Sequence, residues 1–219
     1  MQTIDVSMAR ADVRWGAALA ILQAGFSLRA RRGMSARVFM REVLGFPDAY
    51  IEGVVSTVFL DDSPVDDIDT ARLAEGSRIA LSAAMPGLVG AVMRRHSPYA
   101  ALRETISYRE GGGAEGSSEG GARRDGSGLE SAESAGGPPE IRVGVKLFNS
   151  VMSGRGPEVL ARGIVLADDR ALEALRSLGL EEVASSLRAK AEEGATGAAA
   201  ADAAGKGVEI LLRVVEAPS

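Results

Sequence analysis

The stretch FSLRARRGMSARVFMREVLG, residues 26–45, decides the first half of the fold. Its first six residues alternate between apolar and polar side chains, which is the pattern of a strand with one buried face. Gly33 predicts a turn after this strand. Ser35 is a good N-cap for a helix whose apolar residues recur at i, i+3 and i+4 and therefore share one face. Because Gly45 ends that helix, the stretch predicts a strand, a turn and a helix.

Other segments predict further strands and helices on both sides of this stretch. Alternation or β-branched side chains predict strands at residues 3–8, 54–60, 78–81, 141–147, 163–166 and 208–214. Apolar spacing predicts helices at residues 12–23 and 170–193, with a break near Gly179. Strands and helices both occur in each half of the chain. We therefore expect an α+β fold.

Residues 111–139 differ abruptly from the rest of the chain, because they hold ten glycines, two prolines and a single large apolar residue, Leu129. Such a stretch cannot bury enough apolar area to offset the conformational entropy that ordering would cost. We therefore predict an α+β domain at residues 1–108, a flexible Gly/Ser/Glu-rich linker at 109–139, and a small α+β domain at 140–219. The second domain can add strands to the first.

The order of elements over residues 26–82 resembles the ubiquitin-like β-grasp fold, and specifically the small sulfur-carrier proteins of molybdopterin and thiamin synthesis. Residues 26–45 look like the second strand and main helix of that family. The stretches SPVDD (63–67) and LAEGSRIAL (73–81) are similar to its passage into the last strand. The resemblance covers about a quarter of the chain and implies a β-grasp topology for the N-terminal domain.

The chain departs from that family in two ways. The family works by adenylating and sulfurating a C-terminal Gly-Gly, whereas this chain continues far beyond Gly87 and Gly90. Sulfur-carrier function would therefore require cleavage near these glycines. A helix is also expected before the strand at 26–31, where the family has a tight hairpin.

The composition excludes several classes of function. Cysteine is absent, which removes disulfides, thiolate nucleophiles and Cys-containing zinc sites, and any histidine relay would need the single histidine, His96. We expect no metal site and no cofactor, nominate no catalytic residue, and lean against an enzyme. A net charge of −5 and 4% aromatic residues argue against nucleic-acid binding.

The sequence also gives no sign of a membrane protein. Its longest apolar run, residues 15–22, is far shorter than the roughly 20 residues that cross a bilayer. The N-terminus shows no basic region followed by an apolar one, so no signal peptide is evident. We expect a cytoplasmic protein without a membrane partner.

Two weak anion-binding sites can be nominated. Arg94, Arg95 and His96 could grip phosphate oxygens, although a solvated basic turn is the commoner outcome for such a run. Gly154 and Gly156 follow a predicted strand and could present backbone amides to a phosphate, although an ordinary connecting loop fits them as well. An enzyme or binding protein that acts on a phosphorylated small molecule would use one of these sites.

The acidic run from Asp61 to Asp69 holds five aspartates and could attract a hard cation. Its spacing does not match a calcium loop, because no glycine occupies the sharp-turn position and no glutamate closes it. We expect an exposed acidic hairpin without metal.

The apolar stretch from Met85 to Met93 carries no charge and contains glycines, which favours either a buried crossover or a docking surface. As a docking surface it would use five residues: Met85, Leu88, Val89, Val92 and Met93. The arginines that follow could then pair with the acidic run of a second copy. We expect a non-catalytic binding or assembly module whose partner is another protein or a second copy of this chain.

Overall fold

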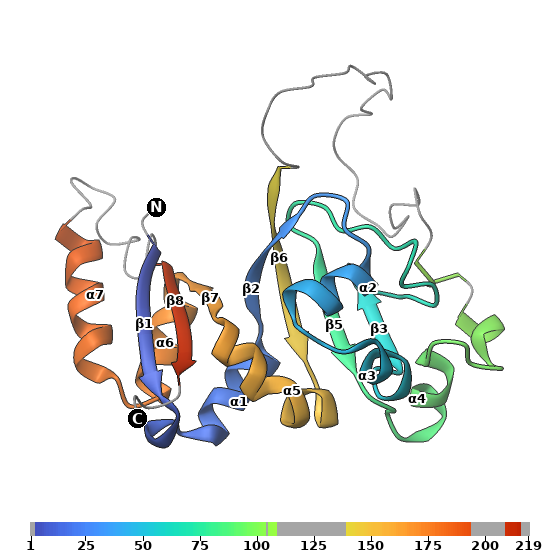
Figure 1. The fold of residues 1–219 in the computed structure, drawn as a ribbon, viewed down its shortest axis with the longest axis horizontal. Helices are drawn as coiled ribbons and strands as arrows, with labels where there is room; N and C mark the ends of the chain where they lie inside the picture. Colours follow the sequence, from blue (N-terminus) through green and yellow to red (C-terminus); the bar gives the residue numbers. More distant parts are fainter. Residues whose placement is uncertain (1–2, 104, 109–138, 194–208, 216–219) are drawn as a thin grey trace, which may run out of the picture.

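One mixed sheet runs along the whole molecule in the computed structural model, which describes residues 3–103, 105–108, 139–193 and 209–215 (Figure 1). The described residues supply eight strands. In spatial order they are β1 (Thr3–Ala9), β8 (Glu209–Val215), β7 (Ile164–Ala167), β2 (Phe26–Arg31), β6 (Glu140–Leu147), β5 (Arg78–Ser82), β3 (Thr57–Leu60) and β4 (Ser63–Pro64). The expected mixture of helices and strands is therefore confirmed at the level of the α+β class.

Strand β6 lies between β2 and β5, although it follows both of them in the sequence by a long interval. It pairs antiparallel with β2, with Leu28 opposite Val143, and parallel with β5, with Leu81 opposite Leu147. The sheet thus crosses the expected boundary between residues 1–108 and 140–219. Whether these two parts unfold separately stays a prediction, and the predicted linker lies outside the described residues except for Pro139.

Strand β1 lies at the far edge of the sheet and pairs in parallel with β8, not with β2 (Figure 1). The helix α1 (Trp15–Ala24) connects β1 to β2. The strands expected at 141–147 and 208–214 share the sheet as predicted, but β2 and β7 separate them. The alternation of apolar and polar residues along a strand predicts which of its faces is buried, but it does not predict which strands pair with it.

The other helical segments are the 3₁₀ turn η1 (Arg10–Asp12), α2 (Ala36–Val38), the π-helical turn η2 (Phe39–Val43), α3 (Asp48–Gly53), α4 (Gly87–Met93), the 3₁₀ turn η3 (Ala100–Arg103), α5 (Asn149–Arg162), α6 (Asp168–Ser177) and α7 (Glu181–Glu193). Ser35 caps α2 as predicted, because its hydroxyl accepts a hydrogen bond from the amide of Val38 at 3.3 Å. The expected break near Gly179 separates α6 from α7. The helix α3 was not predicted, and β3 begins three residues later than the strand expected at 54–60.

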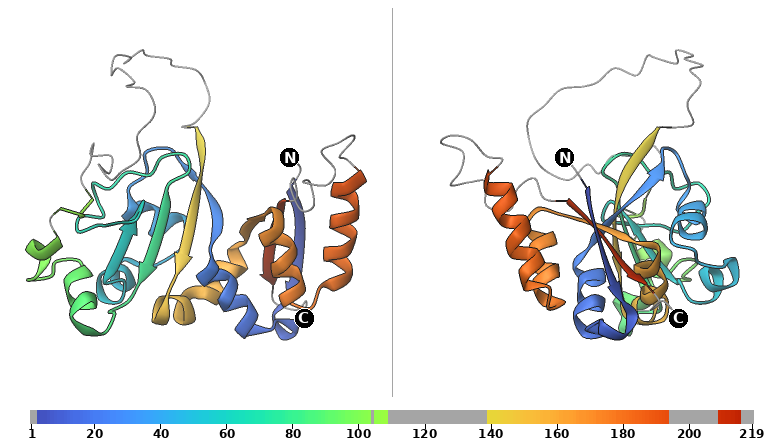
Figure 2. Two further views of the ribbon diagram at one scale, coloured as in Figure 1. Left: turned by 180° about the vertical axis from the view of Figure 1, so that it is seen from behind. Right: turned by 60° about the vertical axis from the view of Figure 1, so that its left-hand side comes forward.

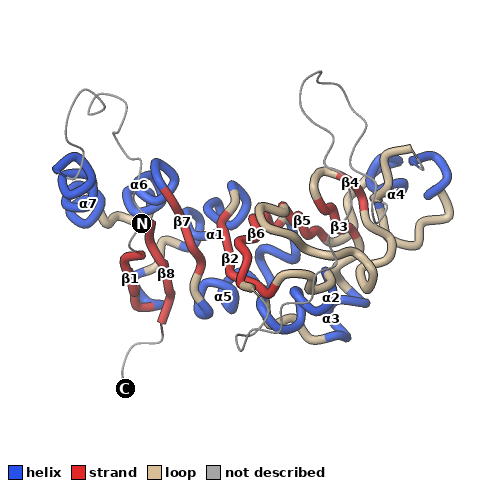
Figure 3. The backbone as a smooth tube through the Cα atoms, turned by 90° about the horizontal axis from the view of Figure 1, so that it is seen from above, coloured by secondary structure: helices blue, strands red, loops and turns tan. Residues whose placement is uncertain are grey.

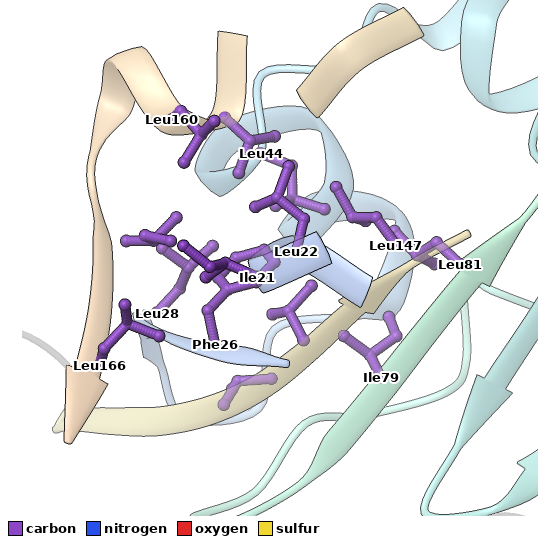
Figure 4. Packing of buried hydrophobic residues seen from close by; sticks show 14 of the residues in the cluster. Ile21, Leu22, Phe26, Leu28, Leu44, Ile79, Leu81, Leu147, Leu160 and Leu166 are labelled. Atoms are coloured by element: carbon purple, nitrogen blue, oxygen red, sulfur yellow. The ribbon is translucent and has the colours of Figure 1, made fainter. Parts of the chain in front are cut away.

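The buried apolar side chains form one core that takes residues from both sides of 109–138 (Figure 4). Leu22 of α1, Leu81 of β5 and Leu147 of β6 are fully buried in it. On β2, β6 and β5 the alternate residues point away from this core and are mainly polar or glycine, as an alternating strand pattern predicts. Among the described residues, none of the helices has both the length and the apolar character that a membrane span requires.

Candidate functional site

Exposed apolar side chains concentrate on the segment that contains α4 and η3, which projects at one end of the sheet (Figure 1). Five of the seven large apolar side chains exposed in the described part of the chain belong to it. Their exposed fractions are 69% for Leu88, 69% for Val89, 49% for Tyr99, 71% for Leu102 and 50% for Ile106. These five residues are called the α4–η3 surface below.

The local backbone explains why α4 turns its apolar residues outward. Gly87 begins the helix with a φ of +78°, a conformation that favours glycine. Gly90 is buried, and a Cβ at this position would lie 2.2 Å from the carbonyl oxygen of Met85. The inner side of α4 is therefore occupied by backbone, which leaves Leu88 and Val89 to face solvent.

The five predicted interface residues differ in how exposed their side chains are. Leu88 and Val89 are exposed, so a buried crossover, the alternative expectation for this stretch, is wrong for these two residues. Met85, Val92 and Met93 are only partly buried. Tyr99, Leu102 and Ile106 were not nominated, because no apolar run marks them in the sequence.

The buried side chain of Arg103 fastens this segment to the body of the protein, with 1% of its side chain exposed. Its Nε donates to the carbonyl of Val92 at 2.7 Å, and its Nη2 donates to the carbonyl of Arg94 at 3.0 Å. The same Nη2 contacts Asp66 Oδ1 at 2.5 Å, and Nη1 donates to Ser107 at 2.8 Å. A single guanidinium thus joins α4, η3 and the acidic loop.

At the nominated anion site, residues 94–96, the two arginines donate hydrogen bonds to backbone carbonyls of the protein itself. The side chain of Arg95 is 5% exposed, and its Nη1 donates to the carbonyls of Val55 at 3.1 Å and Ile51 at 3.4 Å, at the end of α3. Arg94 is exposed, and its Nη2 donates to the carbonyl of Met85 at 3.4 Å. Arg95 therefore acts on backbone carbonyls, as a cation near a helix C-terminus commonly does.

Arg95 and His96 line a hollow of about 380 Å³ together with Arg37, Glu52, Asp66, Asp67, Ile68 and Asp69. His96 itself is exposed, with a φ of +55°, and its amide donates to Asp66 Oδ1 at 3.3 Å. Carboxylates outnumber cations around this hollow, which disfavours an anionic ligand there.

Aspartates of the acidic run, residues 61–69, form ion pairs with arginines of the same chain. Arg37 Nε contacts Asp69 at 2.6 Å, Arg103 contacts Asp66, and Arg78 pairs with Asp62. Three of the five aspartates that were expected to pair with arginines of a second copy therefore already form ion pairs within this chain. Among the described residues, no group of histidine, aspartate and glutamate side chains is placed to hold a metal ion.

Hydrogen bonds shift the pKa values of several groups around Arg37. The hydrogen bond to Asp69, followed by the one to Glu52, raises the pKa of Arg37, and the hydrogen bond from Arg37 lowers the pKa of Glu52. The backbone amide of Asp69 donates to Asp67 at 2.9 Å and is the main cause of the lowered pKa of Asp67. These shifts keep Glu52 and Asp67 ionised and Arg37 protonated at neutral pH.

Gly154 and Gly156 lie in the middle of α5, which corrects the loop predicted for residues 153–157. Backbone amides in a helix interior donate to carbonyls of the preceding turn, so they cannot gather around a phosphate. Arg155 between them stacks over the Tyr50 ring, 4.6 Å from its centroid. Tyr50 is partly buried there, and this burial raises the pKa of its hydroxyl.

Comparisons of this chain with protein-family models, with curated proteins and with solved structures found no match.

Proposed function

We propose that this chain is a non-catalytic binding or assembly module that self-associates through the α4–η3 surface. The observation that carries this proposal is the 69% exposure of both Leu88 and Val89 on a helix whose inner side is already packed. Clustered apolar side chains on a surface commonly mark a contact with another protein. The segment carries no acidic residue between Met85 and Arg95, so a partner would not have to desolvate carboxylates there.

We also propose that residues 26–82 and β6 form a β-grasp-like unit. The support is the pairing of β2, β6, β5, β3 and β4 in one mixed sheet, with the helical segment α2–η2 connecting β2 to the later strands. The family's second strand has a hairpin partner immediately before it. Here the antiparallel neighbour of β2 is β6, which the chain supplies from the far side of residues 109–138.

The other candidate functions gain less support. Arg95 already binds carbonyls, and residues 153–157 are helical, so neither nominated site favours a phosphorylated ligand. Sulfur-carrier function would need cleavage inside α4, where Gly90 is packed against Met85. No contact in the described residues favours such a cleavage.

Replacing both Leu88 and Val89 by Asp tests the proposal. We expect the double variant to stay folded, because both side chains are exposed, and to self-associate at least about tenfold more weakly, because two charges would enter an apolar contact. Sedimentation over a range of concentrations measures this change. Val183→Asp, on α7, is the matched control, because it places a charge on an exposed apolar residue outside the surface.

Two results would contradict self-association through this surface. A wild-type protein that sediments as a monomer at every accessible concentration would exclude a second copy as the partner. A double variant that has lost its secondary structure by circular dichroism would show that these side chains belong to the core.

A further inference from the structure

A different part of the molecule, at the junction of α1, β2 and α6, is hollow. Strands β2 and β7 pair at a single position, Ser27 opposite Val165, so the sheet opens beside this pair. Gly25 connects α1 to β2 with a φ of +119°. Three neighbouring hollows, of about 290, 340 and 200 Å³, are all lined by Gly25 and Arg170.

Two cationic side chains, those of Lys146 and Arg170, lie close to Gly25 at this junction. Lys146 Cε and Arg170 Nη1 lie 3.4 and 3.6 Å from the position that a Cβ of Gly25 would occupy. Both side chains are exposed, and neither makes a hydrogen bond or an ion pair with any described residue. Two like charges beside one glycine repel each other, so an anion between them would lower the energy of both.

The excess of cations holds for the hollow of 200 Å³, where Lys146, Arg170 and Arg78 face a single lining carboxylate. The two neighbouring hollows add three carboxylates. Arg78 lines the hollow of 200 Å³ and is paired with Asp62. Asp168 and Asp169 line the hollow beside β7 together with Arg170. Glu173 lines the groove between α1 and α6, without an ion pair to Arg170.

The floor of the smallest hollow is the outer face of the sheet, which Figure 2 (left) shows from behind with no described helix in front of β6 and β5. Ser27 and Gly144 lie opposite each other in this floor, next to Lys146. Neither has a large side chain. A ligand can therefore approach the backbone closely at this point.

The groove between α1 and α6 adds an apolar wall to the same junction. It is lined mainly by small or apolar side chains, namely Ala17, Ala20, Ile21, Ala24, Leu166 and Ala174. Its volume of about 290 Å³ is at the lower end of the range for small-molecule sites, so a suitable ligand is small. Figure 3 shows α1 and α6 beside β7 and β2 at the middle of the sheet.

We propose that this junction binds a small organic anion, with its oxyanion head, a carboxylate or a phosphate, between Lys146 and Arg170 and its apolar body in the groove between α1 and α6. Charge complementarity selects the head, and the alanine-lined wall selects the body. This site is separate from the α4–η3 surface. A small-molecule site would add ligand binding to a module proposed for assembly.

Calorimetric titration of the full chain tests this inference with four probes: hexanoate, hexyl phosphate, inorganic phosphate and hexylammonium. We expect hexanoate or hexyl phosphate to bind more tightly than inorganic phosphate, and hexylammonium not to bind. Lys146→Gln and Arg170→Gln should each weaken binding about tenfold, because each removes one charge-assisted hydrogen bond. Arg176→Gln, an exposed cation on the same helix, is the matched control and should bind like the wild type.

Ala20→Phe separates the two parts of the site, because Ala20 is exposed and lines only the groove. This variant should lose binding of hexanoate or hexyl phosphate and keep any weak binding of inorganic phosphate. The proposal is overturned if neither organic anion binds the wild type at up to about 10 mM, or if hexylammonium binds equally well. Unchanged binding by folded Lys146→Gln and Arg170→Gln variants would overturn it too. The Leu88 and Val89 double variant should bind the anion normally, so failure of one proposal can be distinguished from failure of the other.

Discussion

Gly154 and Gly156 lie in the same helix, but only Gly156 is approached closely by another helix. A Cβ at Gly156 would lie 2.7 Å from Leu22 Cδ1 and 3.0 Å from Leu19 Cδ2, so α5 contacts α1 closely at this glycine. A Cβ at Gly154 would meet only the Tyr50 hydroxyl, at 3.4 Å, which is an ordinary contact. Both glycines disfavour a helix by roughly 1 kcal/mol each relative to alanine. Only Gly156 is required by packing.

We therefore predict that Gly156→Ala lowers the free energy of unfolding by about 1–3 kcal/mol, because the added methyl group forces α5 and α1 apart. The matched variant Gly154→Ala should raise that free energy by up to about 1 kcal/mol, because it gains helix propensity without a close contact. Urea unfolding followed by circular dichroism measures both. Equal stability of the two variants would mean that α5 and α1 are not in close contact.

At the scale of elements, the α4–η3 segment depends on one side chain for its attachment. Arg103 binds the carbonyls of Val92 and Arg94 and the carboxylate of Asp66, and it is almost fully buried while doing so. Methionine has a similar length and no hydrogen-bond donors. Replacing Arg103 by Met would leave these acceptors without their partner.

The prediction for Arg103→Met is a local loss of order. Amides of residues 87–103 should exchange hydrogen faster, while those of β2, β5 and β6 keep their protection, because the sheet does not depend on this arginine. The free energy of unfolding should fall by about 1–3 kcal/mol, and self-association should weaken although no residue of the α4–η3 surface has changed. Hydrogen exchange measured by mass spectrometry decides this, and unaltered protection of α4 would show that other contacts hold the segment.

At the scale of the whole molecule, the sheet depends on strands from both halves of the chain. β6 forms hydrogen bonds with β2 on one side and with β5 on the other, and its apolar side chains are buried in the common core. Without β6, two strands of the N-terminal half would each expose an unpaired edge in the middle of the sheet.

We predict that residues 1–108 alone show no cooperative unfolding transition. A protease site inserted after Gly120 in the full chain should give two pieces that still elute together, because β6 stays paired with β2 and β5. Size-exclusion chromatography before and after cleavage, with and without urea, checks this outcome. Separation of the pieces in native buffer, or a cooperative transition for 1–108 alone, would instead support two independent domains.

The sequence by itself determined the local elements and several excluded chemistries. Alternation predicted β2 and β6 within one residue of their ends, and Ser35 marked the start of α2, because these signals lie within a few residues of the backbone that they shape. The absence of cysteine excluded thiol chemistry without any knowledge of the fold.

Only the tertiary structure decided which elements are neighbours and what the local signals mean. Glycine and proline predicted a loop at residues 153–157, but Gly156 serves the contact between α5 and α1 inside a helix. The pairing of Arg103 with Asp66, 37 residues away, has no local signal, and neither does the meeting of Lys146 and Arg170 beside Gly25. The alternation of apolar and polar residues predicts which face of a strand each side chain occupies, and it depends only on residues that are close in the sequence. The choice of β6 as the partner of β2 and β5 depends on the apolar area buried when distant segments pack together, and that quantity exists only in the folded chain.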